Sequence, residues 1–363
     1  MIGRPCALSI AGSLTGVVVL ATVLTAPTAE WRNGERFDNR FSDRPEVALS
    51  GPPARIWIDT DAACGAGKRV DPDDCLAILH LANGPEIAGI STVFGNAPLE
   101  ITDATTRRLA HGLGEGLNVH RGAAEPLPDA PPTAAAHALA EALEAGPLTI
   151  VTLGPLTNIA AALDARPDLR ANVDRIVAVM GRRRGHVFHP SEGNGLGILL
   201  GHGPVFRDFN VAQDPKAVAT VLAMDVPLVL VPYEAARRIE IDAASLRRLA
   251  RFGEPHRRVA DAARSWLHYW NDAIGRSGFY PFDLVAALGV VEPDRLQCAQ
   301  ATLSFARDET LSFPFNLAPS LIAEPYDGTE VSADAQPPLY CHSVRADADH
   351  LIAGMARPVV ASR

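Results

Sequence analysis

The sequence is poor in basic residues and above all in lysine. Lys68 and Lys216 are the only lysines in 363 residues, and 33 lysines and arginines face 42 aspartates and glutamates, so the formal net charge is −9. Because neutralising nucleic-acid phosphates requires a basic face, this balance excludes a general nucleic-acid-binding protein. The longest basic run, Arg182 to Arg184, is predicted to be a solvated loop.

Charge is also absent from most of the N-terminus. No charged residue lies between Arg4 and Glu30, and Ala7 to Leu24 is an almost unbroken run of apolar and small residues. Ala26 to Ala29 offers small residues where a signal peptidase could cut, and about 20 apolar residues also suffice to span a bilayer. We therefore expect residues 1–29 to be a signal peptide or a membrane anchor. The protein is then periplasmic or secreted, and any membrane contact is confined to this segment.

Internal repeats and a clear second domain are lacking as well. Residues 30–53 are charged and end in Gly-Pro-Pro, so we expect a linker there, followed by one domain over residues 54–363. Hydrophobic residues make up 47% of the chain, which suffices for a sizeable core and excludes wholesale disorder.

Cysteine is scarce too. Of the five cysteines, Cys6 lies in the leader, which leaves Cys64, Cys75, Cys298 and Cys341. An even number in an exported protein permits disulfides. Cys64 and Cys75 flank a short loop and are the first pair to test, but all four could equally be free, buried thiols.

What the sequence does contain is an alternation of short apolar runs with helical patterns. Regular structure begins at Ile56-Trp57-Ile58, and further buried strands are predicted over Ile87–Phe94, Leu148–Leu153, Ile176–Met180 and Pro227–Val231. Helices are predicted over Leu76–Ala82, over Asn158–Leu163 and from Asp214-Pro215, an N-cap followed by a first-turn proline. This alternation indicates an α/β fold, a mostly parallel, doubly wound sheet flanked by helices in a single domain.

Acidic residues follow the predicted strands, where such sheets bind ligands. Asp59 and Asp61 end the first strand, Asp73 and Asp74 open the next helix, and Asp283 comes much later in the chain. Carboxylates gathered at one sheet edge repel each other unless a cation neutralises them or some remain protonated. Ca²⁺ prefers all-oxygen ligands of this kind. An Asp pair at a helix start also suits a simple N-cap, so that alternative stays open.

Several stretches together resemble the nucleoside hydrolase family, the inosine-uridine preferring and related ribohydrolases. The resemblance runs in order from about residue 54 to the C-terminal region. The matching stretches are residues 56–61 (IWIDTD), 73–78 (DDCLAI), 92–96 (TVFGN), 153–160 (LGPLTNIA), 179–181 (VMG), 208–210 (DFN), 214–215 (DP) and 282–283 (FD).

The resemblance implies a calcium site. Ca²⁺ would be bound by the carboxylates of Asp61, Asp74 and Asp283 and by the backbone carbonyl of Leu153. Asp61 would also act as general base on the metal-bound water, and Asp59 would support the site from behind. The water would attack the anomeric carbon of a ribose through an oxocarbenium-like transition state, which nearby carboxylates stabilise.

The resemblance also implies a substrate, a small-molecule nucleoside. Asp73, Asn96 and Asn210 would hydrogen-bond the ribose hydroxyls, and Asp208 would lie near the 5′ side. Members of the family are usually oligomers, so a homo-oligomer is an expectation of the resemblance alone.

The sequence departs from the family pattern between the first two Asp pairs. Residues 62–72 fill a gap that is usually much shorter, and they bring Cys64, Lys68 and Arg69 toward the site. We expect this loop to form a bulge that leaves Asp73 and Asp74 in place, with a Cys64–Cys75 disulfide as one way to close it.

A second departure concerns the leaving base. Phe282 occupies a position where many purine-active members have a histidine that is thought to protonate the base, a contribution typically worth about 10²–10⁴-fold. His268, Tyr269 and Tyr280, together with the nearby tryptophans, are candidates for a base pocket. Plain helix packing is the alternative for these aromatic residues, and stacking of Phe282 on the base is another.

The segment from Arg182 to Phe206 is a third departure. It is rich in glycine and contains His186, His189 and His202. Such a segment could widen the 5′ side of the site or alter the sugar that is bound, although histidine-rich loops more often have no special role. A zinc site is the remaining alternative, and no recurring ligand spacing supports it.

Two other functions fit part of the pattern. A haloacid-dehalogenase-type phosphatase also ends its first strand in Asp-x-Asp, but it needs a lysine after a later strand, and neither Lys68 nor Lys216 follows one. A non-catalytic sugar- or nucleoside-binding relic of the fold is the other alternative, although such a protein has no physical reason to retain a costly cluster of like charges.

Overall fold

The computed structural model describes residues 41–114, 116–127, 133–186, 208–310, 317–328 and 336–356. The predicted leader, the first part of the predicted linker, His189 and His202 lie outside these ranges. Within them, no helix combines the length and the apolar character needed to cross a membrane.

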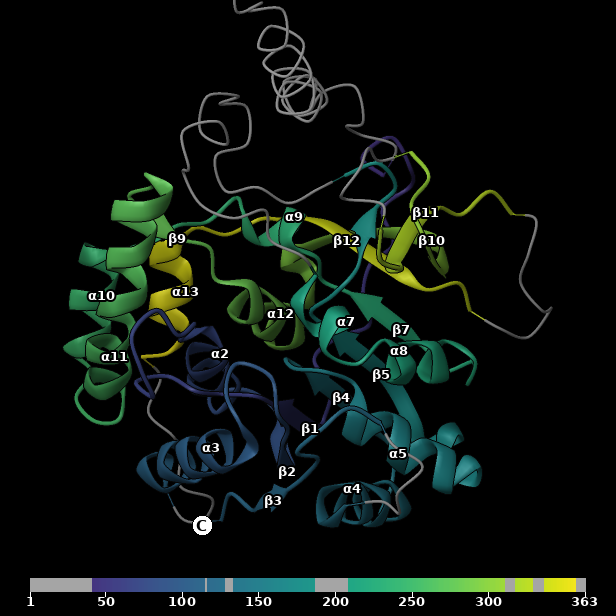
Figure 1. The fold of residues 1–363 in the computed structure, drawn as a ribbon, viewed down its shortest axis with the longest axis horizontal. Coiled ribbons are helices and arrows are strands. Elements are labelled where there is room, and N and C mark those ends of the chain that lie inside the picture. The colour runs from purple at the N-terminus through teal and green to yellow at the C-terminus, as the bar shows by residue number, and fades with distance from the viewer. Residues whose placement is uncertain are drawn as a thin grey trace, which may run out of the picture.

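A parallel sheet forms the centre of the molecule (Figure 1). Its first six strands lie in the order β3-β2-β1-β4-β5-β7, and each is parallel to its neighbour. Their bounds are β1 Arg55–Thr60, β2 Glu86–Thr92, β3 Val119–Arg121, β4 Leu148–Thr152, β5 Val173–Ala178 and β7 Leu228–Leu230. The expected parallel α/β sheet is confirmed, and its strand order reverses between β1 and β4.

Helices cover both faces of this sheet, because alternate side chains of one strand point to opposite sides. In β1, Ile56 and Ile58 pack into one buried apolar cluster, while Trp57 packs into a second one on the other face. The helices are α2 Asp73–Leu81, α3 Leu99–Leu113, α4 Ala134–Glu144, α5 Thr157–Ala165, α7 Phe209–Gln213, α8 Pro215–Leu222, α9 Tyr233–Ala236, α10 Ala243–Ala250, α11 His256–Tyr269, α12 Phe282–Val291 and α13 Ala348–Gly354.

The predicted helix starts are largely confirmed. Asp214 caps α8 by accepting a hydrogen bond from the Ala217 N–H, and Pro215 is the first helical residue, as expected. Helix α2 begins at Asp73 and not at Leu76, because the two aspartates are part of its first turn.

Four further strands extend the sheet beyond β7 in the order β12-β10-β11-β6. They are β6 Arg182–Arg183, β10 Leu296–Ala306, β11 Ser320–Pro325 and β12 Leu339–Val344, and β10 is antiparallel to both of its neighbours. A disulfide joins Cys298 of β10 to Cys341 of β12. A small separate sheet pairs β8 Ile241–Asp242 with β9 Gly278–Phe279.

The described part of the predicted linker packs against this extension. Phe41 is 2% exposed and stacks on Tyr340 with 4.5 Å between ring centroids. The Val47 N–H donates to the Cys298 carbonyl at 2.8 Å. Residues 41–47 therefore lie against the disulfide-linked strands.

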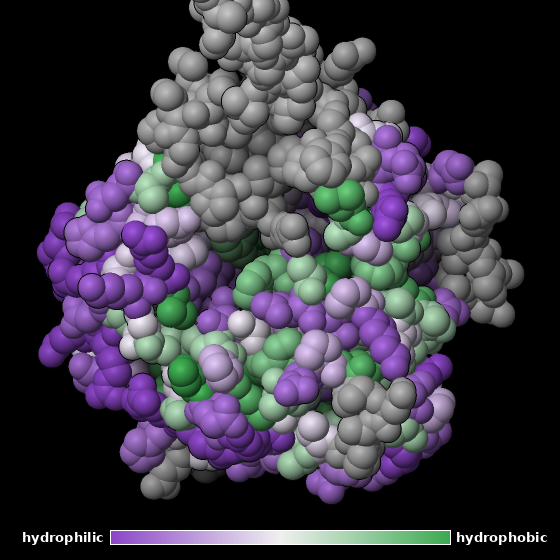
Figure 2. Space-filling view, in the orientation of Figure 1, coloured by the Kyte–Doolittle hydropathy of each residue, from purple (hydrophilic) through white to green (hydrophobic). Residues whose placement is uncertain are grey.

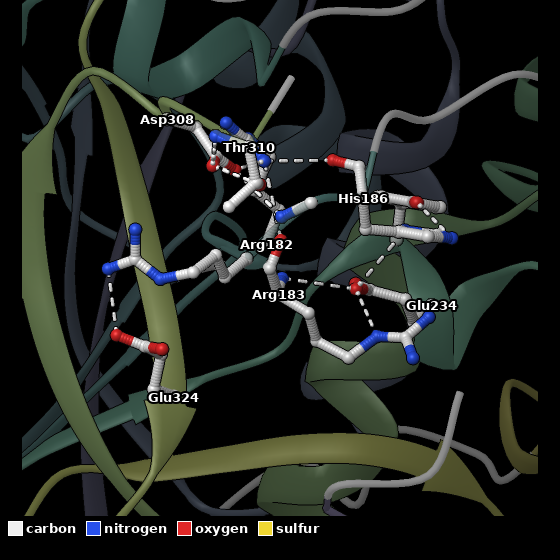
Figure 3. A network of polar contacts seen from close by, with 10 residues as sticks. Arg182, Arg183, His186, Glu234, Asp308, Thr310 and Glu324 are labelled. Carbon is white, nitrogen blue, oxygen red and sulfur yellow. Dashed lines mark hydrogen bonds and ion pairs between the residues drawn. The ribbon is translucent and has the colours of Figure 1, made fainter. Parts of the chain in front are cut away.

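The run Arg182 to Arg184 is not a solvated loop, so that prediction is wrong. Arg182 and Arg183 form β6 and are 8% and 7% exposed. Figure 3 shows the acidic partners that make this burial possible. Arg182 donates to Asp308 at 2.7 Å, Arg183 to Glu234 at 3.0 Å and Arg184 to Glu324 at 2.8 Å. A buried guanidinium is tolerated when it is paired and hydrogen-bonded in this way.

Candidate active site

A cavity of about 870 Å³ opens at the carboxyl ends of the central strands, beside the point where the strand order reverses. Open α/β sheets bind ligands at such switch points. In Figure 2 apolar residues gather at the middle of this face, while α10 and α11 at its edge expose mainly hydrophilic ones. The cavity lining includes these predicted site residues: Asp73, Asn96, Leu153, Asp208, Asn210, Phe282 and Asp283.

The carboxylates of Asp73, Asp74 and Asp283 converge at one point. Each offers an oxygen within 4.8 Å of the others, and all three side chains are buried. Helices α2 and α12 begin with these residues, and the backbone N–H of Asp283 donates to Asp73 Oδ2 at 3.0 Å. No side-chain cap forms at α2, since Asp74 instead accepts from Thr60 Oγ1 and Asn96 Nδ2, at 2.5 Å and 2.9 Å. Neither Asp73 nor Asp74 is the N-cap residue of α2, although both lie in its first turn, where the helix dipole favours carboxylates.

Asp61 joins this group through Asn96. The Asn96 side-chain amide donates to Asp61 Oδ1 at 3.3 Å as well as to Asp74, and its backbone N–H donates to Asp61 Oδ2 at 2.7 Å. Gly95 makes this approach possible, because a Cβ there would lie 1.9 Å from Asp61 Oδ2 and its φ of +154° suits glycine. Asp61, Asp74 and Asp283, predicted to share one ion, thus lie in one cluster.

The electrostatics of the cluster fit a hard cation. Burial, then repulsion from Asp74, raises the pKa of Asp61 well above its usual value. Burial, then repulsion from Asp73 and Asp74, does the same for the pKa of Asp283. Buried carboxylates in contact cannot all be ionised at neutral pH without a neutralising charge. The donors are all oxygens, so the cluster could hold a metal ion of the Ca²⁺ or Mg²⁺ type.

Asp59 lies behind the cluster and is fully buried. Its Oδ1 accepts from Ser91 Oγ and, at 2.8 Å, from Asn158 Nδ2. Trp57 Nε1 donates in turn to Ser91 at 2.8 Å. Burial raises the pKa of Asp59 to about 6 despite these bonds. Asn158, in the first turn of α5, thus holds the end of β1 against the start of that helix.

Asn210 and Leu153 are in direct contact in the lining of the cavity. The Asn210 side-chain amide donates to the Leu153 carbonyl at 2.8 Å and to the Val179 carbonyl at 2.9 Å. Both donors of this amide are therefore used, and its Oδ1 is the atom that is left to accept from a ligand. A carbonyl oxygen has two lone pairs, so Leu153 can accept this bond and still bind a cation.

Asp208 lies at the other end of the cavity and caps α7. Its Oδ2 accepts from the Gly181 N–H at 2.6 Å and its Oδ1 from the Val211 N–H at 3.2 Å. Burial raises its pKa to about 6. His186 lies nearby, stacked on Tyr233 with its Nε2 3.1 Å from the Tyr233 hydroxyl. Sequence reasoning named His186 only as part of the histidine-rich segment, and it did not identify Tyr233.

The predicted base-pocket residues fall in different places. Phe282 and Trp266 line the cavity. His268 lies on the exposed face of α11, and Tyr280 is buried against Trp270, 4.8 Å between ring centroids. Tyr269 is half-buried beneath Arg69. His268, Tyr269 and Tyr280 are therefore not among the described residues that line the cavity.

The loop 62–72 is closed by a Cys64–Cys75 disulfide, the first pair expected. Asp73 and Asp74 directly precede Cys75, so the disulfide ties the start of α2 to the segment that follows β1 and begins with Asp61. Arg69, Val70 and Asp71 of this loop line the cavity. Asp71 also accepts from the Asp73 N–H at 3.2 Å. The sequence signal for a place of Asp71 at the site was its position two residues before the Asp73-Asp74 pair.

Comparison with known proteins agrees with this geometry. The model of the family described as inosine-uridine preferring nucleoside hydrolase matches residues 56–313, so the chain belongs to that family. A pyrimidine-specific ribonucleoside hydrolase of Salmonella enteritidis, RihA, is 27% identical over 231 residues, which are 62% of this chain and 67% of the relative. A non-specific ribonucleoside hydrolase of Escherichia coli, RihC, is 26% identical over 268 residues, 66% of this chain and 79% of the relative.

The solved structures agree in fold. A purine-preferring ribonucleoside hydrolase from Gardnerella vaginalis superposes with a TM-score of 0.65 at 17% identity, covering 84% of this chain and 98% of the other. Family membership places the chain among enzymes that hydrolyse N-glycosidic bonds. It also removes the haloacid-dehalogenase alternative, and the non-catalytic alternative with it.

Proposed function

We propose that this enzyme hydrolyses the N-glycosidic bond of a ribonucleoside, releasing ribose and the free base, with Ca²⁺ as its metal. The observation that carries the proposal is the convergence of the buried carboxylates of Asp73, Asp74 and Asp283, with Asp61 joined to Asp74 through Asn96. Related ribonucleoside hydrolases act on pyrimidine, purine or both kinds of nucleoside, so the relatives leave the base open.

The residues of the site would have distinct roles in metal binding, proton transfer and ribose binding. Asp61, Asp74, Asp283 and the Leu153 carbonyl would hold the ion. A bound Ca²⁺ supplies positive charge that neutralises these carboxylates and lowers the pKa of the attacking water. Asp61 accepts the proton that the water loses. Asp73 and the Oδ1 of Asn210 accept hydrogen bonds from ribose hydroxyls. Asn96 keeps the carboxylates of Asp61 and Asp74 in place through its hydrogen bonds to both.

The charge distribution favours the transition state over the ground state. As the bond to the base breaks, positive charge develops on C1′ and the ring oxygen of the ribose. Carboxylates fixed beside that position stabilise the charge more than they stabilise the neutral nucleoside, which raises the rate of the chemical step.

The experiment is a panel of inosine, uridine, cytidine and adenosine, each incubated with the enzyme in calcium or in excess chelator. Chromatography of the free base and a reducing-sugar assay should show hydrolysis of at least one nucleoside in calcium only. Asp61→Ala and Asp74→Ala should abolish it, whereas Asp174→Ala, an exposed strand residue, should not. Failure of the wild-type enzyme on all four nucleosides would refute the proposal.

We also propose that the enzyme acts outside the cytoplasm as a homo-oligomer. Two disulfides within the described residues support an oxidising compartment, and the apolar N-terminal segment supports export. The oligomer rests on the family resemblance alone. Fractionation of the source cells and light scattering of the purified enzyme test the two statements separately.

A further inference from the structure

We propose that Arg69 contacts the departing base and stabilises its negative charge, in place of a general acid at position 282. This inference rests on the proposed nucleoside hydrolysis. It names the residue that assists the leaving group and the bases that it favours.

The first observation is the position of Arg69 in the cavity. Arg69 and Phe282 belong to the same cavity lining as Asp73 and Asp283. Arg69 is exposed, and it forms no ion pair with another described residue. The other arginine among the described lining residues, Arg182, is buried and bound to Asp308. Arg69 is thus the guanidinium that is available to a ligand there.

The second observation is that Arg69 is held in place. Its backbone has φ +62°, a conformation that non-glycine residues seldom adopt. Its N–H lies 3.4 Å from Ser265 Oγ, and its guanidinium carbon lies 5.3 Å from the centre of the Tyr269 ring. The Cys64–Cys75 disulfide closes the loop that carries it. A cation stacked on an aromatic ring within about 6 Å is stabilised there.

The third observation connects Arg69 with Phe282 through one row of aromatic rings. The ring centroids of Tyr269 and Trp266 are 5.3 Å apart, those of Trp266 and Trp270 6.3 Å, and those of Trp270 and Tyr280 4.8 Å. Phe282 follows at 6.4 Å from Tyr280. A continuous series of ring contacts thus runs from Tyr269, under Arg69, to Phe282, and Trp266 and Phe282 of this series line the cavity together with Arg69.

The chemistry follows from these positions. The C1′–N bond breaks, and its electron pair stays on the base nitrogen. The oxygen of water bonds to C1′, and the proton that this water loses goes to Asp61. Phenylalanine has no proton to give, so the base leaves as an anion and takes its proton from solvent. A guanidinium keeps its own protons but donates hydrogen bonds to the developing charge.

A donor that carries positive charge favours bases with acceptor oxygens and stable anions. Uracil and hypoxanthine have such oxygens, whereas adenine presents an amino group in the corresponding position and forms its anion less readily. Uridine and inosine are therefore the expected substrates, with adenosine the poorest.

The test compares natural nucleosides with 4-nitrophenyl riboside, whose leaving group is already a stable anion. Arg69→Met keeps a long unbranched side chain and removes the guanidinium and its charge. We expect kcat for uridine and inosine to fall by about 10²-fold or more, and kcat for 4-nitrophenyl riboside to change by less than about 3-fold. Arg69→Lys restores charge without the planar fork and should recover part of the loss. Lys68→Met, the exposed neighbour in the same loop, is the matched control and should alter neither substrate.

Each other outcome has a definite meaning. Equal losses on both kinds of substrate would show that Arg69 only shapes the pocket, and no loss on either would show that it plays no part. Both results overturn the proposal. If the wild-type enzyme fails on 4-nitrophenyl riboside and on every nucleoside, the proposed function itself is wrong and the role of Arg69 falls with it. Unchanged melting temperature and calcium binding of Arg69→Met would exclude misfolding as the cause.

Discussion

Replacing Asp283 with asparagine is expected to stabilise the enzyme in chelator and to remove its stabilisation by calcium. Oxygens of Asp73, Asp74 and Asp283 lie within 4.8 Å of one another. Repulsion from the other two carboxylates adds to burial in raising the pKa of Asp283. The amide has nearly the same size but no charge, so the metal-free cluster loses a repulsive partner while the ion loses a ligand.

The magnitude follows from Coulomb's law. Two unit charges 4.8 Å apart repel by about 3.5 kcal/mol at an effective dielectric constant of about 20. Partial protonation reduces this energy, so we expect the free energy of unfolding in chelator to rise by about 1–2 kcal/mol. Each kcal/mol moves Tm by about 1.5 °C in a domain of roughly 310 residues, because the entropy of unfolding is about 2.1 cal/mol/K per residue. Calcium at about 100 times its Kd would add about 2.7 kcal/mol to the wild-type enzyme only.

The assay is thermal unfolding at pH 8 with excess chelator and then with increasing calcium. The expected order of Tm is wild type with calcium first, Asp283→Asn second under both conditions, and wild type in chelator last. Asp174→Asn, an exposed change of the same kind, should follow the wild type throughout. The reasoning is refuted if Asp283→Asn melts below the wild type in chelator, or if calcium still raises its Tm.

Three further outcomes are expected. Gly95→Ala should cost turnover by about 10²-fold or more, since the new Cβ would meet Asp61 Oδ2; steady-state kinetics with a parallel melting curve check it. Cys64→Ser should lower the free energy of unfolding by about 2–4 kcal/mol and should also lower kcat. Cys298→Ser should lower the free energy of unfolding but leave kcat unchanged. Urea unfolding and steady-state kinetics measure the two effects. Burial raises the pKa of Asp208 to about 6, so the protonated form of Asp208 favours the folded state. This contribution to the free energy of unfolding is complete below about pH 4 and is lost, by up to about 3 kcal/mol, as the pH rises through about 6. Asp208→Asn should flatten this part of the profile of stability against pH.

The central part of the fold could be predicted from the sequence because its signals are local. The buried parallel strands β1, β4 and β5 are short apolar runs, and their predicted positions agree with the structure to within a few residues. The Asp cluster was predictable for a related reason. Residues that end parallel strands meet at one sheet edge, whatever their separation in the chain.

The parts that escaped prediction depend on partners far away in the chain. Arg182 is buried because Asp308 lies opposite, 126 residues later, and Arg183 is buried because of Glu234. A run of three arginines carries no sign of either partner. The antiparallel strands β10 and β12 were missed for the same reason, since their pairing depends on register across a long connection.

The side-chain amide of Asn210 is fixed in one orientation, since turning it over would leave the carbonyls of Leu153 and Val179 without donors. In the proposed complex it would therefore contact the sugar through its oxygen alone. A hydroxyl satisfies that oxygen, whereas fluorine, a methyl ether or a bare carbon at the same position brings no proton. Nucleosides whose sugar lacks this hydroxyl, or carries it in capped form, should therefore be poor substrates because of this single atom.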